Sequence, residues 1–129
     1  MPTTQKIRYS DCDPQGIVFN ANYVRYWDDA ITDWFEELGF GGIELGGIGV
    51  DVVTARVEID FKAAAKLGDT LVTEAAVERF GDTSMTVLVT TKRQSDGQIV
   101  AAGKAMYVFV DPEEFRPIAV PESFREAVS

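Results

Sequence analysis

The chain has 129 residues, 46% apolar and 26% charged, a composition typical of one globular domain with a hydrophobic core. Its net charge of −9 argues against the basic surface that a nucleic-acid-binding protein needs. The chain has no histidine, which excludes Ser-His-Asp and Cys-His pairs and histidine-ligated zinc. One cysteine, no long apolar run and no leader-like N-terminus are the features expected of a cytoplasmic protein that does not contact membranes.

The first predicted elements are a short strand at residues 5–10 and a turn at residues 13–16, "DPQG". Pro14 fixes one backbone angle of such a turn, and Gly16 adopts angles that other residues avoid.

A helix is predicted over residues 22–38, because apolar residues recur there every three or four positions. Asn20 or Asn22 is a candidate N-cap, and Gly39 is a candidate C-terminal stop. The apolar stripe is strongly aromatic, so we expect the helix to lie buried against a sheet. Its members are Tyr23, Tyr26, Trp27, Ala30, Ile31, Trp34, Phe35 and Leu38.

Six glycines fall within residues 39–49, but their spacing does not match a dinucleotide-binding loop. Two interpretations stay open for this segment: a flexible connection, or a lid or wall of a pocket.

The rest of the chain is predicted to form strands. In residues 50–61, Val53, Ala55, Val57, Ile59 and Phe61 alternate with polar residues, which predicts one apolar face. Strands are also predicted at residues 70–80, 83–94 and 99–111. An Asp-Gly pair within residues 95–98 indicates a hairpin. Three prolines predict an irregular tail: Pro112, Pro117 and Pro121.

This order predicts an α+β domain over residues 1–129, with a five-stranded antiparallel sheet and one long helix. One helix cannot cover both faces of such a sheet, so we expect a homo-oligomer.

The segment "RYSDCDPQGIVFNANYVRYWDDA", residues 8–30, resembles the 4-hydroxybenzoyl-CoA thioesterase family, whose members have the hotdog fold, a sheet wrapped around one long helix. Two weaker blocks keep the same order: "IDFKAAAKLGD", residues 59–69, and "RFGDTSM", residues 79–85. The family motif consists of an aromatic residue, Asp-x-Asp, a glycine, two aliphatic residues and a tyrosine. The matching residues are Tyr9, Asp11, Asp13, Gly16, Ile17, Val18 and Tyr23.

The resemblance implies an acyl-CoA thioesterase that works as a dimer or tetramer, with active sites between subunits. It assigns catalysis to Asp13, as nucleophile or general base, and polarisation of the thioester carbonyl to the backbone amide of Asn20. The segment from the motif glycine to the tyrosine would contact substrate; here it contributes Gly16, Ile17, Val18 and Tyr23. No cofactor or metal is implied, since coenzyme A is part of the substrate.

Such chemistry suits a chain without histidine. A carboxylate can act as nucleophile or base, and a thiolate leaves without a strong general acid. Amides at the start of a helix carry partial positive charge, which stabilises an oxyanion. A hydratase or dehydratase with the same fold generally relies on histidine, which argues against that activity.

Several residues near the motif have two interpretations. Asp28 matches an acid that reads the ring hydroxyl of an aromatic acyl group in relatives, or it is a solvated charge on the helix. Asn20 stands where relatives often have tyrosine or histidine, and a simple helix cap is its alternative role. We expect Asp11 to hydrogen-bond loop amides, and Cys12 to fill space, because no histidine can activate its thiol.

Asp82 departs from relatives, which often place a cation in this turn near the coenzyme A phosphates. Five other cations are candidates for that contact: Lys62, Lys66, Arg79, Lys92 and Arg93. The alternative to an enzyme is a non-catalytic module that binds acyl-CoA or another small ligand.

Overall fold

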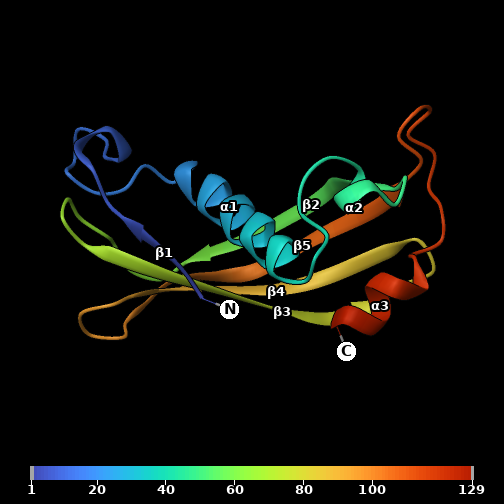
Figure 1. Ribbon diagram of the computed structural model, residues 1–129. Coiled ribbons are helices and arrows are strands. Elements are labelled where there is room, and N and C mark those ends of the chain that lie inside the picture. Colours follow the sequence, from blue (N-terminus) through green and yellow to red (C-terminus); the bar gives the residue numbers. More distant parts are fainter. Residues whose placement is uncertain (1, 129) are drawn as a thin grey trace.

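The computed structural model describes residues 2–128 and contains one curled antiparallel sheet crossed by one long helix (Figure 1). The strands are β1 (Thr3–Lys6), β2 (Asp51–Phe61), β3 (Thr70–Phe80), β4 (Ser84–Arg93) and β5 (Ile99–Val110). The helices are α1 (Asn22–Glu37), α2 (Glu44–Gly47) and α3 (Glu122–Val128), with a 3₁₀ turn at Tyr9–Asp11. None of the helices described is both long and apolar enough to cross a lipid bilayer.

The sheet has the strand order β1-β3-β4-β5-β2, and every neighbouring pair is antiparallel. Hairpins join β3 to β4 and β4 to β5, as the tight turns in the sequence predicted. The short strand β1 forms one edge. The eleven-residue strand β2 forms the other edge and pairs only with β5.

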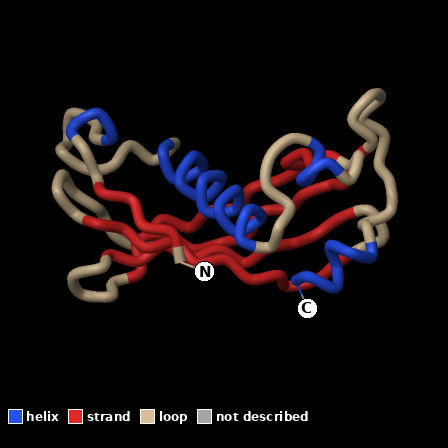
Figure 2. Tube along the Cα trace, viewed as in Figure 1, coloured by secondary structure: helices blue, strands red, loops and turns tan. Residues whose placement is uncertain are grey.

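Helix α1 lies on one face of the sheet (Figure 2) and buries the aromatic stripe predicted for it. All its predicted members are buried except Leu38, which is half-buried. Trp27, 2% exposed, donates its indole N–H to the hydroxyl of Thr91 at 2.9 Å, so its single polar atom is satisfied inside the core. Trp27 and Trp34 are therefore core residues, as expected.

The helix ends as its glycine predicted. Gly39 has a φ of +88° and donates its N–H to the carbonyl of Glu36, while Phe40 donates to Phe35 at 2.8 Å. These two bonds form a Schellman motif, which satisfies carbonyls that the last turn leaves unpaired.

The first strand lies earlier than predicted: it spans Thr3–Lys6 and not residues 5–10. Backbone N–H groups of Asp11 and Cys12 donate to carbonyls three residues back, and the Asp11 carboxylate accepts the Arg8 N–H at 2.8 Å. This local turn competes with strand pairing and stops β1.

The predicted alternation in β2 holds only after a β-bulge between Thr54 and Arg56. Val57 and Ile59 lie opposite Ala105 and Gly103 on the helix-facing side, as predicted. Before the bulge the register shifts by one, so Thr54 faces the helix in place of Ala55.

The tail is not irregular throughout, since it ends in α3. The side chain of Phe124 on this helix is fully buried against Phe35, Phe40, Phe80 and Phe109. Pro121 precedes the helix and accepts hydrogen bonds from two of its amides, so the proline starts α3.

Candidate active site

Asp13 lies in a tight turn between β1 and α1. Cys12 and Val18 form an antiparallel bridge at the base of the turn. Within it, the Asp13 carbonyl accepts the Gly16 N–H at 2.9 Å, and Asp13 donates its own N–H to Ile17 at 2.9 Å. Gly16 has a φ of +78°, which favours glycine. These hydrogen bonds therefore fix the backbone conformation of the turn.

The carboxylate of Asp13 is half-buried and lines a hollow of about 550 Å³. One of its oxygens accepts the Gln15 N–H at 2.8 Å, and the other has no hydrogen-bond donor among residues 2–128. Tyr9 and Leu67 form apolar walls of the hollow, although both are exposed, at 84% and 56%. A free carboxylate oxygen beside an apolar surface can attack a carbonyl carbon or orient a water molecule.

Asp11 connects this turn to the start of α1 through hydrogen bonds. Its carboxylate, 4% exposed, accepts hydrogen bonds from Arg8 N–H at 2.8 Å and from the Arg25 guanidinium at 2.6 Å. Its backbone carbonyl accepts the side-chain amide of Asn22 at 2.8 Å. The expected role of Asp11 in bonding the loop is confirmed by these contacts.

The pKa of Asp11 reflects opposing effects. Burial alone would raise this pKa, but the hydrogen bonds from Arg8 and Arg25 and the charge of Arg25 together hold it below its ordinary value of 3.8. The Tyr26 hydroxyl lies near this carboxylate without satisfying hydrogen-bond geometry, so it acts as a nearby dipole. Asp11 is therefore ionised at neutral pH.

The segment before α1 presents two unpaired backbone amides. The N–H groups of Asn20 and Ala21 have no acceptor among the described residues, whereas Asn22 and Tyr23 donate to Phe19 and Asn20. Neither predicted asparagine caps the helix: Ala21 holds that position, and the Asn22 side chain bonds Asp11 instead. The free amides carry the partial positive charge of the helix start.

The other motif residues have different surroundings. Gly16 lines the hollow beside Asp13, and Ile17 is half-buried and forms a bridge with Lys66. Val18 and Tyr23 are buried in the core of the chain, at 5% and 3% exposure. Burial and the charge of Asp69 raise the pKa of the Tyr23 phenol, which therefore stays protonated.

Asp28 lies elsewhere, in a groove between α1 and β2. The groove consists of two adjoining hollows of about 380 and 180 Å³, and Asp28, Thr54 and Tyr107 line both. None of these three residues lines the hollow of Asp13. A single chain therefore does not place Asp13 and Asp28 in one cavity.

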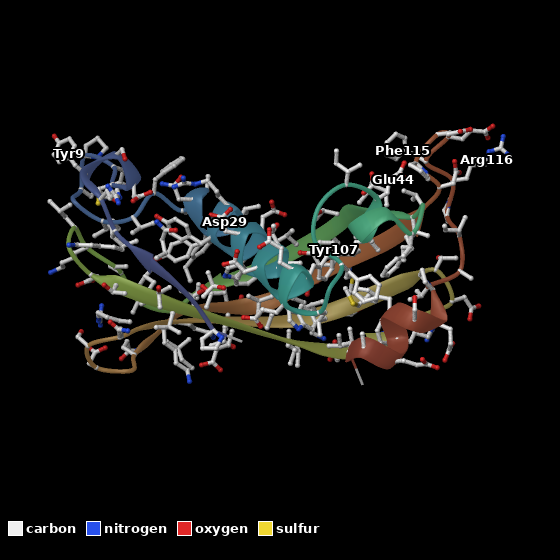
Figure 3. All side chains as sticks on the ribbon, viewed as in Figure 1. Tyr9, Asp29, Glu44, Tyr107, Phe115 and Arg116 are labelled. Carbon is white, nitrogen blue, oxygen red and sulfur yellow. The ribbon has the colours of Figure 1, made fainter. Side chains whose placement is uncertain are left out.

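Thr54 and Tyr107 had no role in the sequence interpretation. Thr54 faces the groove only because of the bulge, whose position the residue pattern does not reveal. In the sequence, Tyr107 is one more aromatic residue within the pattern of a buried strand. In the structure it lies on the sheet beside α1 (Figure 3).

The glycine-rich segment forms one wall of this groove, through Phe40, Gly41, Gly42 and Leu45. Leu45 is buried, and both Glu44 and Leu45 have positive φ angles, of 53° and 50°. Part of the segment therefore forms a pocket wall, although most of its residues are exposed.

Cys12 is half-buried, packs against the core, and its thiol lies 3.7 Å from the Arg8 carbonyl. Asp82 is exposed in the turn between β3 and β4. Of the candidate cations, Arg93 is engaged with Asp96 and with the carbonyl of Ala64. Lys66 is joined to the turn that holds Asp13 through its bridge with Ile17. Within residues 2–128 no three acidic or thiol side chains gather to hold a metal ion.

Comparison with known proteins identifies the family of this chain. The family model of the thioesterase-like superfamily matches residues 7–128. The chain belongs to the thioesterase-like superfamily. This thioesterase is 30% identical to the 4-hydroxybenzoyl-CoA thioesterase of Pseudomonas sp. strain CBS-3 over 135 residues, covering 97% of this chain and 94% of the relative.

Two further relatives agree. The thioesterase is 28% identical to the acyl-CoA thioester hydrolase YbgC of Escherichia coli O157:H7, covering 92% of this chain and 87% of that one. Its fold superposes on a gentisyl-coenzyme A thioesterase with a TM-score of 0.88 and 25% identity, over the full length of both chains. These matches confirm the hotdog fold and the thioesterase class predicted from the motif.

Proposed function

We propose that this thioesterase hydrolyses acyl-CoA, with Asp13 as the catalytic carboxylate and the Asn20 amide as the donor to the thioester oxygen. One observation carries the proposal. A carboxylate with a free oxygen stands on a fixed turn, and Asp11 ties that turn to a helix start with unpaired amides. Carboxylate and amides are the two parts that thioester hydrolysis requires.

Two routes fit these groups. In the first, Asp13 attacks the carbonyl carbon, the C–S bond breaks, coenzyme A leaves as thiolate, and water then hydrolyses the mixed anhydride. In the second, Asp13 takes a proton from water as the water oxygen attacks the carbonyl carbon, and the C–S bond then breaks, so that coenzyme A leaves as thiolate. Under single turnover in labelled water, isotopic oxygen appearing in the Asp13 side chain would favour the first route, with water attacking the aspartyl carbonyl of the anhydride.

An aromatic acyl group is the preferred substrate in this proposal. Two of the matched proteins are named for aromatic acyl groups, 4-hydroxybenzoyl and gentisyl. The groove beside Asp28 has a volume and an apolar lining that suit one such ring. Asp28 then accepts a hydrogen bond from a ring hydroxyl.

The complete site is proposed to form between two copies of the chain. Asp13 and Asp28 line separate hollows of one chain, so a single chain does not place both on one substrate. Strand β2 leaves a long edge unpaired, and such an edge readily pairs with another strand. Pairing of two β2 strands would build a continuous sheet and bring a second copy against the groove.

A panel of aryl-CoA and short acyl-CoA thioesters tests the activity, with free thiol detected as it is released. We expect thiol release with at least one aromatic member of the panel, and loss of that release in Asp13→Asn. Thermal stabilisation by coenzyme A thioesters without any thiol release would instead identify a non-catalytic binding module. No release and no stabilisation would reject acyl-CoA as the ligand.

A further inference from the structure

Three polar side chains converge in the groove between α1 and the sheet. Asp28 of α1, Thr54 of β2 and Tyr107 of β5 are the residues that line both adjoining hollows. Apolar side chains dominate the walls of the larger hollow, among them Val24, Trp27, Val57 and Ala105, with Arg25 at its edge. The smaller hollow is more polar, because Thr32 and Asp51 line it together with Ile31 and Phe35. An apolar groove with a few converging polar groups is the usual form of a site for a small ligand.

Tyr107 supplies a hydrogen-bond donor to this groove. Its side chain is only 5% exposed, and its hydroxyl, which unlike that of Tyr26 is not sealed in the core, makes no hydrogen bond within residues 2–128. Burial, and secondarily the charge of Asp28, raise the pKa of this phenol, so it stays protonated. A buried phenol normally finds a hydrogen-bond partner, and here the groove is where one can bind.

Thr54 lies beside Tyr107. The two residues are opposite each other in the register of β2 and β5, so their side chains stand on the same face of the sheet. The β-bulge that follows Thr54 is what turns this hydroxyl towards the helix. Where the two hollows adjoin, the groove therefore offers two hydroxyls and one carboxylate.

We propose that Tyr107, with Thr54 beside it, determines acyl specificity. Tyr107 donates a hydrogen bond to the ring hydroxyl of an aromatic acyl group, and the same ring hydroxyl donates a hydrogen bond to Asp28. This inference rests on the proposed function and adds two residues to it. A ring hydroxyl is both donor and acceptor, so it satisfies the phenol and the carboxylate together. An unsubstituted ring would bury both without partners, which is costly.

The test compares 4-hydroxybenzoyl-CoA with benzoyl-CoA in wild type and in Tyr107→Phe, which removes one oxygen and keeps the ring packing. The ratio of kcat/KM for the hydroxylated over the unsubstituted thioester should fall about tenfold to a hundredfold in the variant. Tyr26→Phe is the matched control, because it removes the same atom from a buried tyrosine that lines neither hollow, and its ratio should equal that of wild type. An unchanged ratio in Tyr107→Phe would overturn the inference, as would an equal loss on both thioesters.

A binding measurement separates this inference from the proposed function. Calorimetric titration of Asp13→Asn with each thioester should show preference for the hydroxylated one, and the double variant Asp13→Asn/Tyr107→Phe should lose that preference. If wild type releases no thiol from either thioester, the proposed function fails, while the preference in binding still decides the role of Tyr107. If the preference is absent, or persists in the double variant, the role of Tyr107 fails even though the enzyme turns over.

Discussion

At the scale of single residues, two aspartates separated by one position have different surroundings. Asp11 is buried and its oxygens are occupied by Arg8 and Arg25, whereas Asp13 keeps one oxygen free in a hollow. A carboxylate that is fully paired stabilises structure, and one that is half-paired and accessible is available for chemistry. In the proposed mechanism, Asp11 supports the turn and Asp13 reacts.

Asp11→Asn is expected to lower the free energy of unfolding at pH 7 by about 1–3 kcal/mol, because it removes a charged acceptor from two partly buried hydrogen bonds. The folded-state pKa of Asp11 is depressed, so its contribution is present above pH ~4 and is lost as pH falls through the folded pKa. Urea unfolding at a series of pH values measures this. The difference between wild type and variant should shrink in acid.

Asp29→Asn is the control for that series, because Asp29 lies on the exposed face of α1 (Figure 3) and makes no hydrogen bond among the described residues. It should shift stability by no more than about 0.5 kcal/mol. An Asp11 effect as small as this one, or one that is constant with pH, would contradict the role assigned to the pair with Arg25.

Part of the candidate site was predicted from the sequence. The resemblance of residues 8–30 to a thioesterase family singled out Asp13, Asn20 and Asp28. Thr54 and Tyr107 could not be predicted, since their convergence depends on a bulge and on pairing between distant strands. The N-cap prediction was wrong because the Asn22 side chain bonds the Asp11 carbonyl, a contact that requires the folded turn.

At the scale of elements, the helix and the strands that flank the groove were predictable from periodicity. Helix α1 and the three hairpin strands match the predicted segments closely, because long periodic patterns dominate their packing. The short elements β1 and α3 were misplaced or missed. Local hydrogen bonds end β1, and packing of Phe124 among distant aromatic rings stabilises α3; neither leaves a periodic pattern in a short segment.

Gly103 is expected to be required for the pairing of β5 with β2. A Cβ at this position would overlap the carbonyl oxygen of Glu58 on β2, which is backbone and has little room to move. Gly103→Ala should therefore destabilise the protein by about 3 kcal/mol or more, measured as the free energy of unfolding. Gly68→Ala offers a comparison, since its Cβ meets no atom and only its φ of +89° adds strain. A smaller loss for Gly103→Ala than for Gly68→Ala would contradict this account of the sheet edge.

At the scale of the whole molecule, the two hollows predict that activity belongs to an assembly. If Asp13 of one copy acts on a substrate in the groove of another, two differently damaged chains should complement each other. Asp13→Asn removes the carboxylate, and Thr54→Trp fills the groove; each alone should be inactive. Mixed dimers retain one intact site, so random pairing should restore about one quarter of wild-type activity.

Co-expression of the two variants with different affinity tags allows the mixed species to be purified and assayed. Light scattering on the wild-type protein should give a mass of two or four chains. A monomeric mass at every concentration, or a mixture no more active than its separate components, would contradict a site shared between subunits.

The central claim is that Asp13 performs the chemistry, and kcat for Asp13→Asn on the thioester that wild type hydrolyses fastest tests it most directly. The account predicts a fall of about 10²–10⁴-fold, the usual contribution of a catalytic base, with an unchanged unfolding curve. Asp29→Asn, the same change on the exposed face of α1 and outside the Asp13 hollow and the groove, should retain wild-type kcat. Hydrolysis by folded Asp13→Asn at the wild-type rate would contradict the account.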